Sequence, residues 1–227
     1  MSKSIVIAID GPAGSGKSTA AKFLARELGF LYLDTGAMYR AVTYLALKYN
    51  IVEDTNSIND LVNKIFINLK YEDGVTRVFV DDEELTDKIR TFEVNSNVSI
   101  IAKIPEVRTA LVDMQRKIAS NNNLVTEGRD TTTVVFPEAD LKIYLIASIA
   151  ERAKRRLEEF RVKNPDITLA EVQKNLEERD RIDSSRAVSP LKKAEEAIVI
   201  DTTNMSIADE IDEVMKRIDL IKSESTI

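Results

Sequence analysis

Apolar residues gather in five short runs, and longer stretches with helical spacing lie between most of them. The runs are Ile5–Ile9, Phe30–Leu33, Asn123–Thr126, Leu141–Ile146 and Ala197–Ile200. Short runs that are apolar throughout, or nearly so, are typical of buried strands, and parallel strands need helices as crossover connections. The pattern therefore predicts an α/β fold in which helices join parallel strands.

Helical spacing is clearest after each of the first two runs. The apolar positions are Ala20, Ala21, Leu24, Ala25 and Leu28 after the first run, and Ala41, Val42, Leu45, Ala46 and Tyr49 after the second. Gly29 follows the first set, where a helix C-cap is expected. We therefore expect the first helix to end there.

Two segments depart from this rhythm. Residues 65–85 alternate around Asp73-Gly74, a strong signal for a β-hairpin, so we expect a small antiparallel insert. Residues 148–187 are highly charged, and their helical stretches carry little apolar surface. We expect this second segment to be a mobile, solvated excursion from the core.

Composition narrows the chemistry. The 227 residues are 44% apolar and 31% charged, which is typical of a soluble globular protein. The sequence contains no cysteine and no histidine, which excludes zinc–thiolate sites and a histidine base. Any metal should then be a hard cation held by oxygen, such as Mg²⁺.

Charge and hydropathy also bear on partners and location. The net charge of −6 argues against a dedicated nucleic-acid binder. No apolar run approaches the roughly 18 residues of a membrane span, and the first residues do not resemble a signal peptide. We expect a cytoplasmic protein that binds neither nucleic acid nor membrane, and a monomer, because no long heptad pattern demands a partner.

A glycine-rich turn follows the first predicted strand and matches the pattern G-x-x-x-x-G-K-S/T in full. Backbone N–H groups of such a loop face a polyphosphate, its lysine bridges the terminal phosphates and its serine ligates magnesium. Here the lysine is Lys17 and the serine is Ser18. The candidate nucleotide contacts are Gly11, Pro12, Ala13, Gly14, Ser15, Gly16, Lys17, Ser18 and Thr19.

A second candidate anion site follows the second predicted strand, in LDTGAMYRAV. Asp34 and Thr35 can simply cap the helix that begins near Gly36. Arg40 is harder to explain structurally, because the macrodipole disfavours a cation near a helix N-terminus unless an anion lies in front of it. Tyr39 could pack against a planar ring.

Two further segments carry arginines. In TEGRD, Arg129 lies at the carboxyl end of a predicted strand, where open α/β sheets bind ligands, although it could also pair with Glu127 or Asp130. In ERDRIDSSR, the spacing of Arg179, Asp183 and Arg186 puts all three on one face of a helix. That face is either a solvated, salt-bridged surface or a binding site.

A polyphosphate loop together with several separated arginines indicates a phosphoryl transferase with two anionic substrates. In such chemistry positioning and cationic stabilisation do most of the work, and arginine binds phosphate oxygens bidentately. A basic patch in the excursion could reach the donor phosphates or form a solvated face: Arg152, Arg155 and Arg156.

These motifs together resemble the bacterial cytidylate kinases, in the order of that family and over most of the chain. The segments that carry the resemblance are IAIDGPAGSGKST, LDTGAMYRAV, EVRTALVDMQR, TEGRD with TVVFPEADLKIYL, and ERDRIDSSRAVSPL. The resemblance implies a P-loop fold like that of adenylate kinase. Its expected parts are a five-stranded parallel sheet with flanking helices, a small antiparallel β insert in the NMP-binding region, and a helical lid.

The resemblance also implies an activity, which is ATP- and Mg²⁺-dependent phosphorylation of CMP and dCMP. The residues implied to act on the phosphates are Lys17, Arg40, Arg129, Arg179 and Arg186, with Ser18 on the metal and Arg152, Arg155 and Arg156 on ATP. The implied acceptor contacts are Asp34, Thr35, Gly36, Tyr39, Arg40, Ser99, Arg108, Arg129, Asp130, Arg179, Asp183 and Arg186. Among them Ser99, Arg108 and Asp130 would read cytosine, whose donor and acceptors they match, and Asp183 would bind a sugar hydroxyl.

The implied division of the chain has three parts. The core comprises residues 1–62, 96–147 and 188–227, the NMP-binding insert residues 63–95, and the lid and acceptor clamp residues 148–187. One departure from the family lies at Thr131 and Thr132, where an aliphatic residue and a glycine are usual. Threonine does not adopt positive φ cheaply, so the resemblance leaves the turn geometry beside Asp130 open.

Other functions stay open on the residues alone. A kinase for thymidylate or shikimate would need a different acceptor pocket. A nucleotide-dependent switch or binding protein would leave the acceptor-side arginines without a role, and the one Asn-Lys pair with suitable spacing, in NKIF, lacks the aspartate of a guanine-specific segment. An RNA-binding role lacks aromatic residues interleaved on the basic face.

Overall fold

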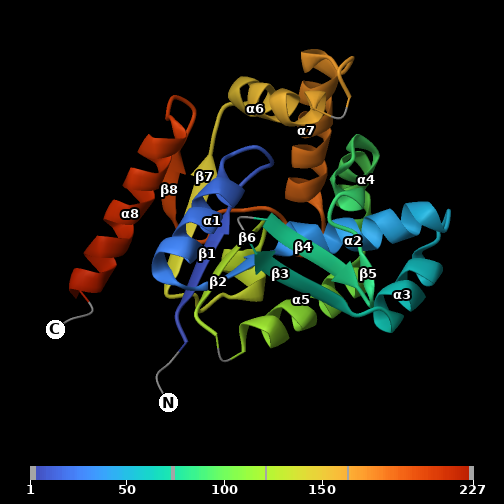
Figure 1. Cartoon of the computed structure of the whole chain (residues 1–227), viewed down its shortest axis with the longest axis horizontal. Helices are drawn as coiled ribbons and strands as arrows, with labels where there is room; N and C mark the ends of the chain where they lie inside the picture. Colours follow the sequence, from blue (N-terminus) through green and yellow to red (C-terminus); the bar gives the residue numbers. More distant parts are fainter. Residues whose placement is uncertain (1–3, 73–74, 121, 163, 225–227) are drawn as a thin grey trace.

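The computed structural model describes residues 4–72, 75–120, 122–162 and 164–224, and its centre is a five-stranded parallel sheet (Figure 1). The strand order is β2-β6-β1-β7-β8. The strands are β1 Val6–Asp10, β2 Leu31–Asp34, β6 Leu124–Gly128, β7 Leu141–Ile146 and β8 Ile198–Asp201. The predicted parallel sheet is confirmed, and the predicted strand bounds differ from the observed ones by at most two residues.

Helices α1 and α8 cover one face of this sheet, and α2 and α5 cover the other. The helices are α1 Lys17–Leu28, α2 Thr35–Lys48, α3 Thr55–Lys64, α4 Phe92–Ala102, α5 Pro105–Ala119, α6 Ile149–Arg161, α7 Leu169–Ser185 and α8 Ile207–Glu224. Gly29 ends α1 as predicted, at φ 65°, and its N–H donates to the carbonyl oxygens of Ala25 and Arg26. Among the residues described, none of these helices is long and apolar enough to cross a bilayer.

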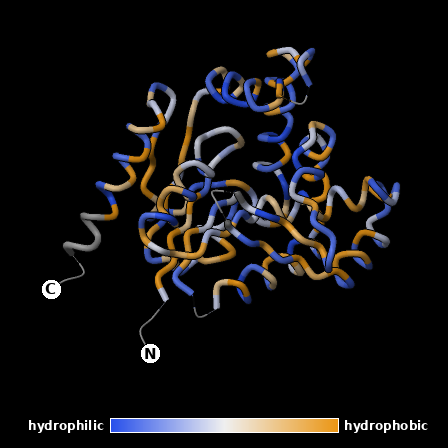
Figure 2. The backbone as a smooth tube through the Cα atoms, viewed as in Figure 1, coloured by the Kyte–Doolittle hydropathy of each residue, from blue (hydrophilic) through white to orange (hydrophobic). Residues whose placement is uncertain are grey.

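Alternation of side chains along the strands divides the core into two layers. Ile7, Ile9 and Val125 pack with α1 and α8 on one face, and Leu33 and Leu124 pack with α2 and α5 on the other. Figure 2 shows the apolar colour concentrated along the strands and the inward sides of the helices. Because both faces are covered, the polar chemistry is left to the edge where the strands end.

The predicted antiparallel insert is present as a separate sheet of three strands. Its strands are β3 Ile67–Glu72, β4 Val75–Val80 and β5 Glu83–Glu84, and β3 pairs with β4 from Ile67↔Val80 to Glu72↔Val75. The turn predicted at Asp73-Gly74 lies outside the described residues. The 3₁₀ turn η1, Lys88–Arg90, follows the sheet and leads into α4.

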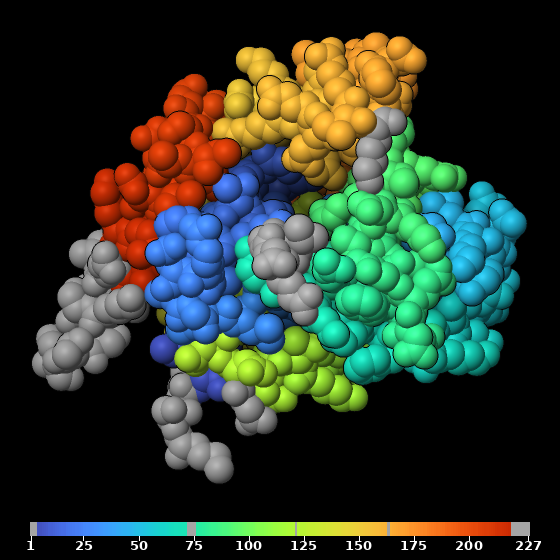
Figure 3. Space-filling model, in the orientation of Figure 1, coloured from blue at the N-terminus to red at the C-terminus, as the bar shows by residue number. Residues whose placement is uncertain are grey.

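Residues 148–187 differ from the expected solvated excursion. Helices α6 and α7 pack on each other around a buried apolar cluster that includes Ala153, Leu157, Phe160 and Leu176. The expectation of little apolar surface is therefore wrong, because Ala153, Leu157 and Phe160 lie one and two turns apart on one face, with charged residues between them in sequence. Ala13 of the phosphate loop belongs to the same cluster, so α6 and α7 pack against that loop (Figure 3).

Candidate active site

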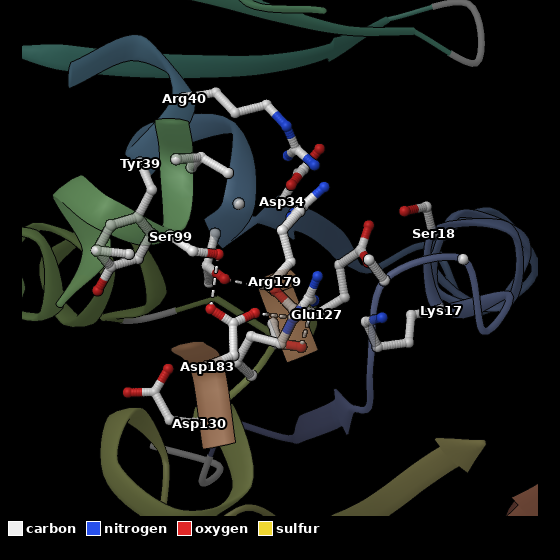
Figure 4. A pocket seen from close by; sticks show the side chains of 18 of the residues that line it. Lys17, Ser18, Asp34, Tyr39, Arg40, Ser99, Glu127, Asp130, Arg179 and Asp183 are labelled. Atoms are coloured by element: carbon white, nitrogen blue, oxygen red, sulfur yellow. Dashed lines mark hydrogen bonds and ion pairs between the residues drawn. The ribbon is translucent and has the colours of Figure 1, made fainter. Parts of the chain in front are cut away.

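A strongly charged pocket lies beyond the carboxyl ends of β1, β2 and β6, beneath α6 and α7. Its volume is about 290 Å³, at the lower end of the range typical of small-molecule sites. Nine cationic and five acidic side chains are among its lining residues. An excess of positive charge in a protein with a net charge of −6 indicates an anionic ligand. Figure 4 shows Lys17 and Ser18 on one side of this pocket, and Tyr39, Ser99 and Asp130 on the other.

The phosphate loop has the backbone conformation that its glycines predict. Gly11, Gly14 and Gly16 have φ values of 149°, 79° and 98°, in a region that other residues rarely adopt. A Cβ atom at Gly11 would lie 2.0 Å from the Leu145 carbonyl oxygen of the neighbouring strand β7. The loop therefore depends on glycine both for its conformation and for its close contact with the sheet.

Lys17 opens α1 and is buried beside this loop. Its Nζ donates to the Pro12 carbonyl oxygen at 2.6 Å and to Ser15 Oγ at 3.3 Å. Burial lowers the pKa of this ammonium far below its ordinary value, and the charge of Arg129 lowers it further. A polyphosphate in the loop would place negative charge beside this ammonium and so favour its protonated form.

The neighbouring side chains fit a magnesium ion held partly by phosphate. Ser18 is exposed at the first turn of α1, and in the described part of the chain its hydroxyl makes no hydrogen bond. Glu127 at the end of β6 lines the same pocket, and one of its oxygens accepts a 2.6 Å hydrogen bond from the Tyr32 hydroxyl. No cluster of three or more acidic residues that could hold a metal occurs among the described residues. Oxygen donors of this kind suit Mg²⁺, which keeps water and phosphate as its remaining ligands.

Three arginines from three helices meet in the pocket around one buried asparagine. Arg40 on α2, Arg156 on α6 and Arg179 on α7 all donate to the Asn95 side chain, at 3.3, 2.8 and 3.4 Å. Burial lowers the pKa of Arg40 to about 10, and burial with repulsion from Arg40 lowers that of Arg179 more strongly. Arg156 also pairs with the exposed Glu159, but the acceptor that all three guanidinium groups share is neutral, and cationic groups held this close around a neutral acceptor form an anion site.

A second group of polar residues lies at the far end of the pocket. Arg108 donates to the Asp130 carboxylate, and both side chains are almost completely buried. The Arg108 guanidinium lies 5.1 Å from the centre of the Tyr39 ring. Arg186 belongs with this group, because its Nη2 is 3.9 Å from the nearer Asp130 oxygen.

Asp183 links the two groups. It accepts hydrogen bonds from Ser99 Oγ at 2.8 Å and from Arg129 Nε at 3.1 Å. The guanidinium groups of Arg129, Arg179 and Arg186 outweigh burial and hold the pKa of Asp183 below its ordinary value. Arg129 thus pairs with Asp183 rather than with Glu127 or Asp130.

The alternative of a solvated helix face fails for the third arginine segment. Arg179, Asp183 and Arg186 have only 4, 4 and 8% of their surface exposed. Helix α7 ends at Ser185, so Arg186 lies just beyond it with extended backbone, and its Nε donates to the Ser189 carbonyl oxygen at 2.7 Å. The structure therefore brings Arg40, Arg129 and Arg179 together and puts Arg186 with Asp130.

At the start of α2, Asp34 caps the helix, whereas Thr35 and Gly36 shape the pocket. Asp34 caps the helix by accepting from the Ala37 N–H at 2.9 Å, and it also pairs with Arg90 at 3.2 Å. Thr35 does not cap, because its hydroxyl donates to the Glu127 carbonyl oxygen at 2.6 Å. Gly36 makes room for an arginine, since a Cβ there would lie 2.8 Å from Arg40 Nη1.

The three arginines of α6 point to different places. Arg152 donates to the Ala13 carbonyl oxygen at 3.2 Å and pairs with Asp180, so it joins the phosphate loop to α7. Arg155 donates to Thr202 beyond β8, whereas Arg156 lines the pocket and donates to Asn95. Arg152, Arg155 and Arg156 therefore do not form the single basic patch that the sequence predicted.

Asp10 at the end of β1 fixes the turn beside Asp130 through Thr131 and Thr132. The buried Asp10 carboxylate accepts four hydrogen bonds, from the backbone N–H and the hydroxyl of each threonine, at 2.6 to 3.0 Å. Neither threonine has positive φ. These bonds hold the single π-helical turn η2, Thr131–Val135, and the backbone beside Asp130.

Three residues of the site were not predicted from the sequence. Glu127 and Arg90 line the pocket, and Asn95 lies behind its arginines. Asn95 precedes Ser99 by four residues on α4, and Glu127 precedes Arg129 by two at a strand end. Helical spacing and the strand-end rule could have drawn attention to both. Nothing in the sequence near Arg90 indicated that it meets Asp34.

The parallel sheet, the phosphate loop after β1 and the facing arginine cluster together define a phosphotransferase of the P-loop nucleotide kinase class. Comparison with protein families makes this specific. The cytidylate kinase family matches residues 7–220, and the chain belongs to that family.

Relatives and solved structures agree with this assignment. The cytidylate kinase of Fusobacterium nucleatum is 48% identical over 219 residues, which are 96% of this chain and 99% of the relative. That of Listeria monocytogenes serotype 4b is 50% identical over 220 residues, 96% of each chain. An uncharacterised protein of Eubacterium ventriosum, 14% identical, superposes over 95% of this chain and 98% of its own with a TM-score of 0.52, which is a likeness of fold alone.

Proposed function

We propose that this cytidylate kinase family member transfers the γ-phosphoryl group of ATP to CMP and dCMP, with Mg²⁺. The observation that carries the proposal is a single pocket that joins the phosphate loop to an arginine cluster and ends at the buried Arg108–Asp130 pair. The loop suits a triphosphate, the cluster suits a monophosphate, and the pair offers one acceptor and one donor to a base. A kinase for nucleoside monophosphates needs these three features in this order.

The far end of the pocket is proposed to read cytosine. Its exocyclic amino group is a donor that the acceptor-only Asp130 carboxylate can bind, and its carbonyl and ring nitrogen are acceptors for Arg108 and Ser99. The Tyr39 ring, 7% exposed, would lie beside the nucleotide. A pyrimidine with a carbonyl in place of the amino group would set two acceptors against each other at Asp130.

Asp183 is proposed to bind the sugar through a hydroxyl that ribose and deoxyribose share. It lies between the base-reading pair and the phosphate-binding arginines and is held by Ser99 and Arg129. A contact to the 3′-hydroxyl, rather than the 2′-hydroxyl, would let the site accept CMP and dCMP alike.

The transfer itself needs no general base. A phosphate monoester has its second pKa near 6, so the attacking oxygen of the acceptor is already ionised at neutral pH. Arg40, Arg129 and Arg179 would hold the acceptor phosphate in line with the donor. Lys17 would neutralise the charge that develops on the donor phosphates. Magnesium, held in part by Ser18, would add charge neutralisation on the donor phosphates.

ADP release from ATP and Mg²⁺ tests this function. CMP, dCMP, UMP, AMP, dTMP and shikimate are each offered singly at the same concentration. We expect fast turnover with CMP and dCMP and at least a tenfold lower kcat/KM with the others. Turnover with a different acceptor would refute the cytosine reading, and binding of ATP without turnover of any acceptor would favour a binding protein.

Two wider expectations rest on the same proposal. Both substrates are nucleotides of the cell interior, so the reaction would take place in the cytoplasm. A monomer stays a prediction, to be checked by light scattering of the purified chain.

A further inference from the structure

Asn95 occupies an unusual position behind the acceptor phosphate site. It lies in the second turn of α4, and only 1% of its surface is exposed. Its Nδ2 donates to the Thr91 carbonyl oxygen at 2.8 Å, so the amide oxygen faces the arginines. That one oxygen accepts from Arg40 Nε, Arg156 Nη2 and Arg179 Nη1.

The three bonds use one N–H of each guanidinium, and Arg156 gives a further N–H, on Nη1, to the Glu159 carboxylate. An arginine has five N–H donors, and Asn95 takes one from each of the three. Arg40 gives its Nε, which leaves both terminal nitrogens for a ligand. Asn95 itself is not among the residues that line the pocket, so it contacts the arginines from behind.

The amide is also neutral, which matters in this cluster. Asp34 is engaged by Arg90 and by the α2 backbone, and Asp183 by Arg129 and Ser99. Arg156 also pairs with the exposed Glu159, whereas the oxygen that all three arginines share carries only a partial charge. A neutral acceptor orients guanidinium groups without neutralising them, and their positive charge stays available to a phosphate.

We propose that Asn95 is a positioning residue for phosphoryl transfer, which holds Arg40, Arg156 and Arg179 in their phosphate-binding orientation and keeps the site electron-poor by being uncharged. The inference rests on the proposed function and deepens it. Arg156 comes from α6 and Arg179 from α7, while Arg40 and Asn95 come from α2 and α4. The same oxygen therefore joins the α6–α7 segment to the acceptor side.

The sharpest variant is Asn95→Asp, because it keeps the size of the side chain and changes its charge. The new carboxylate would pair with the three guanidinium groups and compete with the acceptor phosphate. We expect kcat/KM for CMP to fall about 10- to 100-fold, mainly through a higher KM for CMP. The KM for ATP should change by less than about threefold.

Asn95→Ala separates positioning from simple packing. It removes the orienting oxygen but adds no competing charge, so we expect a smaller loss of about 3- to 10-fold, chiefly in kcat. A residue needed only for packing would show the reverse order, because alanine leaves a cavity and aspartate does not. Asn97→Asp and Asn97→Ala are matched controls, since Asn97 lies on the same helix and its Nδ2 donates to the Glu93 carbonyl oxygen at 3.0 Å. Both should retain wild-type kinetics.

Calorimetric titration of CMP into each protein without ATP measures the acceptor site directly. We expect the dissociation constant of Asn95→Asp to rise by the same factor as its KM. The inference is overturned if Asn95→Asp keeps a kcat/KM within twofold of wild type, or if Asn95→Ala loses more activity and more thermal stability than Asn95→Asp. If wild type prefers another nucleoside monophosphate, the proposed function fails, but the same variants measured with that acceptor still test Asn95, because the cluster binds phosphate rather than base.

Discussion

Replacement of Asp130 by asparagine tests the reading of the base. One oxygen of the Asp130 carboxylate accepts from Arg108, and the other is 3.9 Å from Arg186 Nη2. As an acceptor it suits the 4-amino group of cytosine but not the 4-carbonyl of uracil. An asparagine amide can present its NH₂ to that carbonyl, so Asp130→Asn should weaken CMP and favour UMP.

The magnitude follows from the burial of the pair. Asp130 is 4% exposed and Arg108 is 2% exposed, so the bond from the cytosine amino group to a charged acceptor is worth about 1.5–3 kcal/mol. That range corresponds to about a 10- to 150-fold loss in kcat/KM for CMP. The efficiency with UMP should stay level or rise. The ratio of the two efficiencies should therefore fall at least about tenfold.

Stability is the main confounding effect. Loss of one partner of a buried ion pair costs about 3–5 kcal/mol, so Asp130→Asn will also melt at a lower temperature. The ratio of efficiencies for CMP and UMP cancels this effect, because both are measured on the same folded fraction. Glu178→Gln is the control, since Glu178 pairs with Arg181 on an exposed face at 2.6 Å.

The assay is steady-state ADP release with each acceptor at several concentrations. An unchanged CMP-to-UMP ratio in Asp130→Asn, in a protein that still binds ATP, would refute the assignment of Asp130 to the base. An equal fall with both acceptors would assign Asp130 to holding Arg108 and Arg186 in place.

Three further predictions concern the donor, the sugar and pH. Lys17→Ala should lower kcat by about 10³-fold or more with an unchanged circular dichroism spectrum, because Lys17 is the cationic residue of the loop sequence GPAGSGKS, and near-normal turnover would contradict this. Asp183→Ala should lower kcat/KM for CMP and dCMP about equally, by about 10- to 100-fold, and a loss confined to CMP would assign Asp183 to the 2′-hydroxyl. Burial raises the pKa of Glu210 from 4.5 to about 7, so folding favours its protonated form and stability falls as pH rises through that interval. Glu210→Gln removes this loss and should be more stable than wild type by about 1–3 kcal/mol at pH 8 but not at pH 4.5, as measured by urea unfolding, whereas a pH-independent difference would contradict the reasoning.

The phosphate loop and the strands of the central sheet could be predicted from the sequence, because both depend on local interactions. Gly11, Gly14 and Gly16 specify a loop that other residues cannot form, and apolar runs specify strands buried on both faces. The pair Arg108 and Asp130 came from resemblance to a family rather than from spacing, whereas spacing put Asp183 on one helix face with Arg179 and Arg186 without deciding between a solvated surface and a binding site. Their contacts became visible with the tertiary structure.

The α6–α7 segment shows where local pattern misleads. Its apolar residues are few, and charged neighbours mask their helical spacing in any average over the sequence. They are nevertheless buried because two such faces meet, and Ala13 of a distant loop completes the cluster. Burial of a sparse apolar face depends on a partner surface, which the sequence of the segment does not contain.

The sequence by itself determined the fold class, the donor loop and the kinds of charged group that the site would use, because each depends on neighbouring residues or on a short repeat. Only the tertiary structure decided which charges meet. Asn95 bonds to arginines on three other helices, Arg186 lies beside Asp130 rather than in the cluster around Asn95, and Asp10 holds two threonines more than a hundred residues away. Such contacts follow from strand order and helix packing, which bring distant segments to one edge of the sheet, and no local propensity encodes them.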